Sequence, residues 1–291
     1  MNILSEIKDF LHNAWYQQMR TSLREKIKDR YGMSEDVGVR QVIEYLDNHP
    51  ESPLPLGMNP PYEWTKDYRE EDVEVLRDEV RDLHYVIYRG HKVYFPRKES
   101  VAEIRQAVRI GLMEQDKRSP HSYVSGEFDI EQGDTAVFIG ASDGMFCLSR
   151  LERLSKAYLF EPASHWHEPL RATFEPWGDR VEIVPLAVAE ISGDGQISLD
   201  DFFKGKIPPN FIQVDVDGVD WEVLQGAHAI IGKAKKLRLA LCTYHKRLDF
   251  PRFANFLKPL GYTIDHSPGY FLIGVRMPYL RYGVLYASKL R

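Results

Sequence analysis

The stretch DTAVFIGASDGMF, residues 134–146, decides the fold class of this chain. It joins a short apolar run, typical of a buried strand, to two glycines four residues apart and then to an apolar continuation. Glycine adopts backbone angles that other residues avoid, so such a loop lets a ligand approach the backbone closely at the top of a strand. Phe138 stands, however, where nucleotide-binding loops of this sort often carry an acid. The pattern indicates a cofactor site, the remains of one, or only a tight turn.

Strand-like and helix-like segments alternate on both sides of this loop, from about residue 119 onward. This alternation predicts parallel βαβ units and therefore a doubly wound α/β sheet. The last two predicted strands, YTIDHS (262–267) and YFLIGVR (270–276), follow each other without a helix, so we expect one of them to form an antiparallel edge strand. The other predicted strands are 135–139, 157–161, 180–188, 211–216 and 237–244, and the helices are 145–154, 165–175, 219–231 and 250–260.

Residues 1–118 have a different character, and we expect a mainly helical N-terminal region before a domain at 119–291. Apolar residues recur at helical spacing from Leu4 to Ile27. A second helix is predicted at 34–49 with Ser34 as its cap, and a third at 100–115 with Ser100 as its cap. Between them, HYVIYRGHKVYF predicts a β-hairpin near residues 84–96.

Composition excludes several classes of protein. Of the 291 residues, 43% are hydrophobic and 28% charged, as expected of a globular protein. A net charge of −5 gives no general attraction to nucleic acid or to anionic membranes. No apolar run approaches the roughly 18 residues of a membrane span, and the N-terminal residues do not resemble a secretory signal. The two cysteines have no metal-binding spacing, so we expect reduced thiols and a cytoplasmic location.

An acid at the end of the next predicted strand sharpens the reading of the glycine loop. Glu161 lies one helix beyond the loop, where a carboxylate can accept both hydroxyls of a ribose; the alternative is a solvated acid that caps the following helix. The loop lacks the GxGxxG pattern of dinucleotide sites, and Asp143 would repel a pyrophosphate. A cationic sulfonium without phosphates, S-adenosylmethionine, is electrostatically easier to bind than a nicotinamide dinucleotide.

Four segments together resemble the FkbM family of S-adenosylmethionine-dependent methyltransferases. They are FIGASDG (138–144), LFEP (159–162), FIQVDVDGVDWEVLQGA (211–227) and LALCTYHKRLDFPRFANFLKPLGYTI (239–264), within a similarity that extends from about residue 119 to 288. The resemblance implies a class I methyltransferase fold, Rossmann-like, with methyl transfer to a hydroxyl of a small molecule or glycan. It also implies that the loop lines the methionine part of the cofactor, that Glu161 holds the ribose, and that Asp215 and Asp217 face the transferred methyl group. The loop residues are Gly140, Ala141, Ser142, Asp143 and Gly144.

Three departures from the family pattern weaken this picture. Phe138 replaces a usual acid, Gln213 a commonly basic residue, and Asp217 a longer Glu. Loss of one charge-assisted hydrogen bond at Phe138 would cost roughly 1.5–3 kcal/mol of cofactor binding. The alternative function is therefore a weakly binding or inactive relative that acts as a binding or regulatory protein. A nicotinamide-dependent oxidoreductase is a third, disfavoured class.

Candidate catalytic residues end the fourth and fifth predicted strands. A hydroxyl needs a base, and His245 suits this role, with Asp249 placed to hold its other nitrogen. Asp215 and Asp217 point the same way if the strand stays regular, and they would orient the acceptor, act as the base, or hold a divalent cation. The alternatives are a strand-end histidine without a catalytic role, and capping of the next helix by Asp217 or Asp220. No metal site is predicted from histidines or cysteines.

The N-terminal helices have two competing interpretations besides simple packing on their own domain. In the first interpretation, they cover the open top of the cofactor pocket and shape the acceptor site. In the second, the apolar stripe of the first helix forms a homodimer interface.

Overall fold

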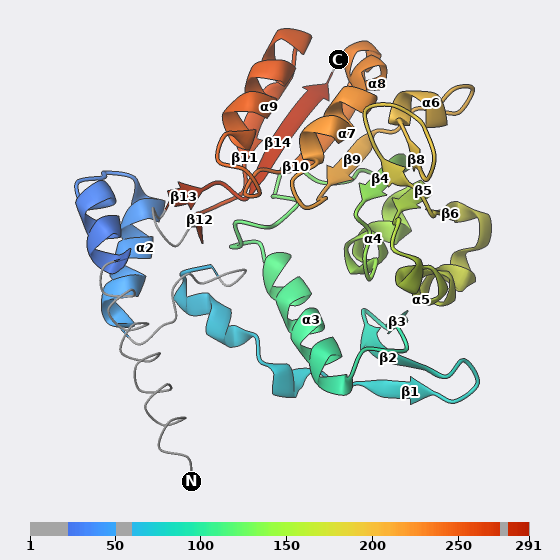
Figure 1. The fold of residues 1–291 in the computed structure, drawn as a ribbon, viewed down its shortest axis with the longest axis horizontal. Coiled ribbons are helices and arrows are strands. Elements are labelled where there is room, and N and C mark those ends of the chain that lie inside the picture. The colour runs from blue at the N-terminus through green and yellow to red at the C-terminus, as the bar shows by residue number, and fades with distance from the viewer. Residues whose placement is uncertain (1–22, 51–59, 274–278, 291) are drawn as a thin grey trace.

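A seven-stranded sheet in the order β11–β14–β10–β9–β4–β5–β6 forms the centre of the molecule (Figure 1). The computed structural model describes residues 23–50, 60–273 and 279–290. All strands are parallel except β14, which is antiparallel to both β10 and β11. The strands are β4 (Asp134–Ile139), β5 (Leu154–Phe160), β6 (Val181–Val184), β9 (Phe211–Val214), β10 (Lys236–Cys242), β11 (Thr263–His266) and β14 (Val284–Leu290).

Helices cover both faces of this sheet, so its strands are apolar on both sides. Within β4, Phe138 faces the α4 and α5 side, whereas Val137 and Ile139 pack on the side of α6 to α9. This alternation follows from the two-residue period of a strand. The helices are α4 (Met145–Arg150), α5 (Ser164–Phe174), α6 (Leu199–Phe202), α7 (Asp220–Gly226), α8 (His228–Lys233) and α9 (Asp249–Leu257), and a small parallel pair is formed by β7 (Ala187–Val188) and β8 (Gln196–Ile197).

The reversed strand of the sheet is not the one predicted. In its described part, residues 270–273, the segment YFLIGVR contributes β12 (Phe271–Ile273), which pairs with β13 (Tyr279–Arg281) in a separate two-stranded sheet. The antiparallel place is taken by β14, whose residues from Val284 to Ala287 are buried. The chain leaves the sheet after β11, forms the β12–β13 ribbon, and returns. The prediction of a doubly wound, mostly parallel sheet with an antiparallel strand is confirmed. The expectation that one of the segments 262–267 and 270–276 supplies this strand was wrong, because β11 has the direction of the parallel strands and β12 pairs outside the sheet.

The local predictions for the N-terminal region are confirmed at the hairpin and at one of two caps. β2 (Leu83–Tyr88) and β3 (His91–Tyr94) pair around a two-residue turn, joined by β1 (Leu76–Asp78). Ser100 caps α3 (Val101–Glu114) in a capping box with Glu103. The cap of α2 (Val37–Asn48) is Asp36, which accepts from the Val39 N–H, so the choice of Ser34 was wrong.

The predicted first helix is described only from residue 23, where it is helical to residue 31. Leu23 and Ile27 are buried against Val42 and Leu46 of α2, so this part of the apolar stripe packs within the chain. Residues 1–22, which carry most of the proposed dimer interface, lie outside the described residues. Within the described part of the chain, no helix is both long and apolar enough to cross a membrane.

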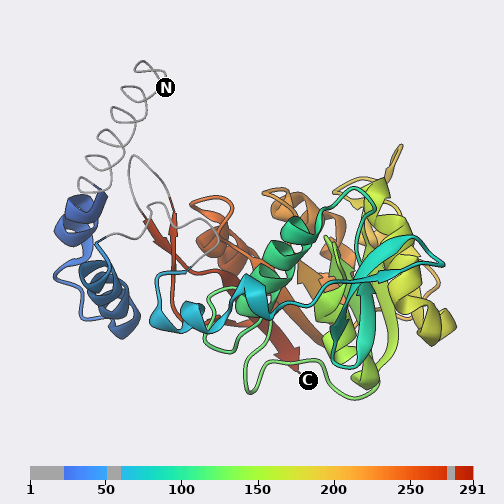
Figure 2. The same ribbon diagram turned by 90° about the horizontal axis from the view of Figure 1, so that it is seen from below.

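Parts of the N-terminal region share a core with the sheet domain. Val86, Val93 and Ile104 belong to the same hydrophobic cluster as Phe138 and Leu148. Figures 1 and 2 show α3 between the N-terminal helices and the β1–β3 sheet, beside the large domain. Residues on the two sides of the proposed boundary at 118/119 are therefore packed together, and α3 is positioned to contribute to a site on the sheet.

Candidate active site

A cavity of about 300 Å³ lies at the carboxyl ends of β4 and β9. These neighbouring strands flank the point where the strand order reverses, which is where open α/β sheets bind ligands. The volume is at the lower end of the roughly 300–1,000 Å³ typical of small-molecule sites. The cavity is lined by Ala107, Ile110, Gly111, Glu114, Gln115, Tyr123, Phe138, Gly140, Ala141, Ser142, Asp143, Gly144, Met145, Phe146, Cys147, Gln213 and Asp215.

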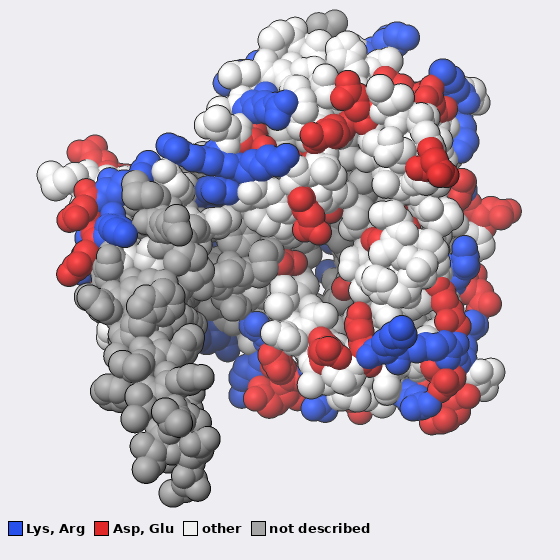
Figure 3. Space-filling view, in the orientation of Figure 1, with Lys and Arg blue, Asp and Glu red and all other residues white. Residues whose placement is uncertain are grey.

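One wall of the cavity comes from the N-terminal region. Ala107, Ile110, Gly111 and Glu114 of α3 line it together with the β4–α4 loop. Figure 3 shows the surface hollowed between α3 and α4, with acidic side chains around the hollow. Of the described N-terminal helices, α3 lines this cavity and α2 does not.

The two loop glycines are required by the packing of the protein itself. Both have positive φ, 79° at Gly140 and 74° at Gly144. A Cβ on Gly140 would lie 2.0 Å from the Asp215 carbonyl oxygen, and one on Gly144 would lie 2.6 Å from the Phe174 ring. The space that these glycines leave open is thus filled by protein atoms. The loop reaches the cavity through the backbone and side chains between them, including Ser142, which also has a positive φ of 47°.

Asp143 lies in this loop as predicted, and it is one of the residues that line the cavity. Its Oδ1 accepts a hydrogen bond from the Met145 N–H at 2.8 Å. Burial raises the pKa of Asp143 to about 6, against the lowering effect of that hydrogen bond. A carboxylate with a raised pKa is one that a cationic ligand would stabilise.

Glu161 faces the loop but does not line the cavity. Its Oε2 accepts from the Ser142 N–H and its Oε1 from the Ala163 N–H, both at 2.9 Å. The residue is only 6% exposed. Each carboxylate oxygen retains a lone pair, but a ribose could reach it only after the side chain gained exposure. Its role as a ribose ligand stays a prediction.

Asp215, at the tip of β9, is the centre of a polar cluster at the end of the cavity. Tyr123 donates to its Oδ2 at 2.6 Å and Tyr244 to its Oδ1 at 3.2 Å. The Nε2 atoms of His121 and His245 lie 3.4 and 3.5 Å from these oxygens. Burial favours protonation of Asp215, but the hydrogen bond and charge of His121, with those of Tyr123 and His245, outweigh it and hold the pKa below its usual range. Asp215 is therefore an anion.

His121 lies between two carboxyl groups and is almost completely buried, with 1% of its side chain exposed. Its Nδ1 is 3.8 Å from Glu114 and has no hydrogen-bond partner, while its Nε2 faces Asp215 and the Tyr244 hydroxyl. Burial alone would lower the pKa of His121, but the charges of Glu114 and Asp215 raise it from 6.5 to about 9. The cluster thus contains a buried imidazolium at neutral pH.

The charge of His121 gives a testable dependence of stability on pH. Because the folded-state pKa is raised, its contribution is fully present below pH 6.5 and is lost as the pH rises through about 9. This contribution is about 3 kcal/mol. In urea denaturation, the difference in unfolding free energy between wild type and His121→Gln should shrink from pH 6 to pH 10. A constant difference over this range would show that His121 is not the charged group.

His245 is oriented by a different acid from the one predicted. Its Nδ1 lies 2.9 Å from Asp220 Oδ2, and its Nε2 faces Asp215. Asp249 instead accepts from the Lys246 N–H at the start of α9, so the prediction that it holds His245 was wrong. Burial opposes the charged form of His245, but Asp220, followed by Asp215, raises its pKa above the ordinary value. An Asp–His–Asp chain therefore runs from the start of α7 to the cavity.

Asp215 and Asp217 do not point the same way, because β9 ends at Val214. Asp217 has a φ of +39°, is exposed, and is not among the cavity residues. The alternative that Asp217 or Asp220 caps the next helix is also wrong, since the cap position is Val219, with no side-chain hydrogen bond. Asp217 therefore lies outside the cavity.

A metal ion does not fit this cluster. His121, Asp215 and Cys242 bring one ligand atom each within 4.8 Å of one another. Burial raises the pKa of the Cys242 thiol well above its ordinary value, and metals bind the thiolate. Both oxygens of Asp215 already accept hydrogen bonds from tyrosines. The cluster is therefore explained as a hydrogen-bonded network.

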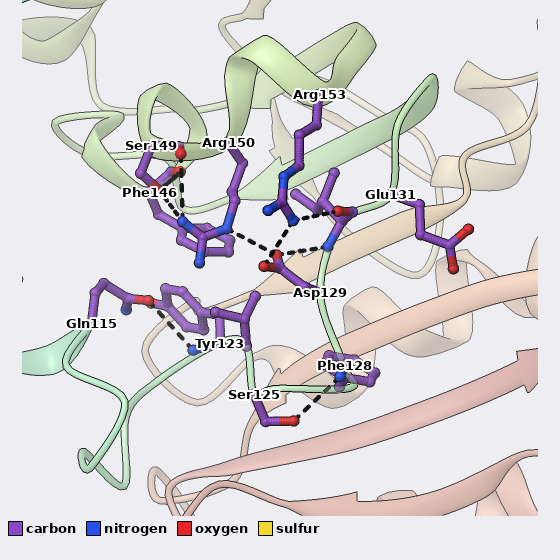
Figure 4. A network of polar contacts seen from close by, with 12 residues as sticks. Gln115, Tyr123, Ser125, Phe128, Asp129, Glu131, Phe146, Ser149, Arg150 and Arg153 are labelled. Carbon is purple, nitrogen blue, oxygen red and sulfur yellow. Dashed lines mark hydrogen bonds and ion pairs between the residues drawn. The ribbon is translucent and has the colours of Figure 1, made fainter. Parts of the chain in front are cut away.

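The segment between α3 and β4, which contains His121 and Tyr123, is held at both ends by hydrogen bonds. Figure 4 shows those of Tyr123 and Asp129. At one end, the Gln115 Oε1 accepts from the Tyr123 N–H at 3.4 Å. At the other, Asp129 accepts from Arg150 Nε at 2.9 Å and from Arg153 at 3.1 Å. These contacts tie the segment to α4 and so place residues from outside the sheet against Asp215.

Glu114, His121 and Tyr123 were not predicted as site residues, and the role predicted for Asp220 was wrong. The stretch SPHSYVSG, 119–126, precedes β4 and combines a histidine with a tyrosine, but nothing in its pattern indicates which strand end these side chains reach.

The strand order and the antiparallel β14 define a class I methyltransferase (Rossmann-like) fold. No protein-family model matches the chain, and a search of curated proteins finds no relative. Among solved structures, similarity is found to an FkbM methyltransferase from Methylobacillus flagellatus KT, with 16% identity, a TM-score of 0.45, and coverage of 96% of this chain. The match spans 60% of that protein's length.

Two further similar structures are smaller proteins. A putative methyltransferase from Streptococcus mutans in complex with SAH is 14% identical, with a TM-score of 0.40 over 55% of this chain and 91% of its own. An rRNA methylase from Streptococcus thermophilus is 12% identical, with a TM-score of 0.39 over 56% of this chain and 90% of its own. At these identities and TM-scores, the likenesses assign neither a ligand nor a reaction to this chain.

Proposed function

We propose that this protein binds S-adenosylmethionine in the cavity between α3 and the β4–α4 loop, and transfers its methyl group to a hydroxyl of a small molecule or sugar. The observation that carries the proposal is the charge of the cavity. Glu114, Asp143 and Asp215 line it, whereas none of its described lining residues is a lysine or arginine. Burial raises the pKa of Glu114, and the charge of Asp215 is partly balanced by His121, so the attraction of a cationic ligand and the repulsion of phosphates rest chiefly on Asp143.

The β4–α4 loop fits the cofactor in charge, whereas Glu161 would have to turn toward the cavity to reach its ribose. The Asp143 carboxylate and the backbone of the β4–α4 loop would hold its methionine part, and Glu161 remains the expected ribose ligand. When bound, S-adenosylmethionine supplies an electrophilic methyl group. Phe138 and Phe146, whose rings pack edge to face with centroids 5.6 Å apart, give this part of the cavity an apolar floor.

The chain's own contribution to the reaction is the handling of a proton. His245 Nε2 faces Asp215, and Asp220 holds the opposite ring nitrogen. In its neutral form His245 can accept the proton of an acceptor hydroxyl, while Asp220 stabilises the imidazolium that results. Because the pKa of His245 is raised, this form becomes more abundant at alkaline pH. Asp215 and Tyr244 would contribute further to the rate by aligning the acceptor hydroxyl with the methyl group.

A second candidate function is a binding or regulatory protein that retains the fold without catalysis. It is favoured by the buried position of Glu161, whose carboxylate contacts the loop backbone, and by the Phe138 ring in the cavity lining.

Calorimetric titration distinguishes the candidates. We expect S-adenosylmethionine and S-adenosylhomocysteine to bind with one site per chain, and NAD not to bind, because its pyrophosphate would meet Asp143. Affinity of the cationic ligand should fall by up to about tenfold between pH 7.5 and pH 5, since protonation of Asp143 below its pKa of about 6 removes a negative charge.

The control for this titration is Asp143→Asn, which should bind weakly at both pH values and lose most of the pH dependence. Binding of NAD comparable to that of S-adenosylmethionine would contradict the proposal. Binding without turnover on any hydroxyl acceptor would favour the second candidate.

A further inference from the structure

Four cationic side chains gather beside the loop that carries His245. Arg30 and Arg247 each lie over the ring of Tyr279, with 4.3 Å from each guanidinium carbon to the ring centroid. Arg281 is on the same short strand as Tyr279, and Lys246 precedes Arg247. Together these four residues are called the basic strip. Figure 3 shows a band of Lys and Arg side chains over β13, between α2 and α9.

Among the described residues, no ion pair neutralises the basic strip. Across residues 23–50, 60–273 and 279–290, neither Arg30 nor Lys246 nor Arg247 forms a side-chain ion pair with a carboxylate. Arg281 donates to the carbonyl oxygens of Tyr244 and His245, and its buried Nε has no hydrogen-bond partner. Other arginines near the surface, by contrast, pair with acids. Arg77 pairs with Asp82, Arg81 with Glu175, and Arg97 with Asp82 and Glu168.

Two acids border the strip and do not cancel it. Asp249 accepts a hydrogen bond from the Lys246 N–H, and its negative charge raises the pKa of Arg281. The negative charge of Asp217 likewise raises the pKa of His245. Burial lowers the pKa of Arg281, and the positive charge of Arg247 contributes to this lowering. An anion placed there would therefore relieve repulsion between guanidinium groups.

The strip is continuous with the candidate active site through His245. Arg281 fixes the backbone of His245, whose Nε2 faces Asp215 at the end of the acidic cavity. The Lys246 side chain passes 3.4 Å from the position a Cβ would take on Gly218, at the tip of the loop after β9. An acidic compartment thus lies on one side of His245, and a basic surface on the other.

We propose that the basic strip binds a phosphate or diphosphate group of the methyl acceptor, an inference that rests on the proposed function. Arginine guanidinium groups match the geometry of phosphate oxygens. Phosphate groups excluded from the acidic cavity would be held beyond His245, and the hydroxyl of the same molecule would then reach His245 and Asp215. The cationic cofactor would then lie on the acidic side of His245, and the anionic group of the acceptor on its basic side.

Calorimetric titration of the full chain with sodium pyrophosphate at low salt tests this proposal. We expect wild type to bind pyrophosphate, and the double variant Arg30→Gln, Arg247→Gln to bind it at least about tenfold more weakly. Affinity for S-adenosylmethionine should stay within about twofold, because neither arginine lines the cavity. The matched control is Arg171→Gln, an exposed arginine on α5.

Three outcomes would overturn the proposal: no pyrophosphate binding by wild type, an equal loss in Arg171→Gln, or binding of succinate as tight as that of pyrophosphate. The last would mean that the strip selects carboxylates. If pyrophosphate bound at the strip but S-adenosylmethionine did not bind at all, the anion site would be supported and the proposed function would be refuted.

Discussion

Replacement of Asp215 by Asn is expected to lower the free energy of unfolding by about 3 kcal/mol, as is typical when one partner of a buried charged pair is removed. Asp215 is the acid beside the Nε2 atoms of both His121 and His245, and its side chain is only 20% exposed. Without its charge, the imidazolium of His121 would be buried with Glu114 as its remaining counterion. Urea denaturation at pH 7 measures the change.

The matched control is Asp217→Asn, two residues further along the chain. Asp217 is exposed and has a left-handed backbone that asparagine also tolerates, so its replacement should change stability by no more than about 0.5 kcal/mol. If Asp217→Asn proved as destabilising as Asp215→Asn, the central position of Asp215 would be contradicted. Loss of methyl transfer in Asp215→Asn alone would extend the distinction to catalysis.

Substitution of Gly140 by Ala is expected to destabilise the fold by more than about 4 kcal/mol, to the point where little folded protein is recovered. Two effects add. A left-handed backbone costs a non-glycine residue about 1–2 kcal/mol. In addition, the new Cβ would lie 2.0 Å from the Asp215 carbonyl, and that carbonyl belongs to the backbone that positions the site. Thermal unfolding or soluble yield reports the loss.

Gly133→Ala separates these two effects. Gly133 has a φ of +85°, but no atom lies within 4 Å of the place its Cβ would take. Its replacement should therefore cost only the backbone term of about 1–2 kcal/mol. Equal losses in the two variants would show that the close approach of β4 to the chain after β9 is not what requires glycine at 140.

The sheet could be predicted because its signal is local. β4, β5, β9 and β10 are short apolar runs bounded by turns and separated by helices, and such a sequence permits few topologies. The reversed strand was assigned wrongly because Phe271 and Val284 both begin apolar stretches. Only long-range pairing with β10 decides which of them enters the sheet.

The site could be predicted only where strand ends define it. Asp215 directly follows β9, His245 lies three residues after the end of β10, and Asp143 lies in the loop after β4. The fold brings the cluster of Asp215 and His245 to the end of the cavity. The side chains of Tyr123 and Asp215 are in contact although they are 92 positions apart in the sequence, and no sequence pattern predicts such a contact. The orientation of the Glu161 side chain could not be predicted either. It depends on the hydrogen bond from the Ser142 N–H, whose position is set by the left-handed backbone of Ser142.

The most direct test of the account is a crystal structure of the protein with S-adenosylhomocysteine. We predict the ligand between α3 and the β4–α4 loop, with its amino group beside Asp143, its sulfur directed toward Asp215, and Glu161 turned outward to the ribose hydroxyls. A ligand bound elsewhere, or a cavity in which the Phe138 ring occupies the place of the ligand and Glu161 keeps its contact with Ser142, would contradict it.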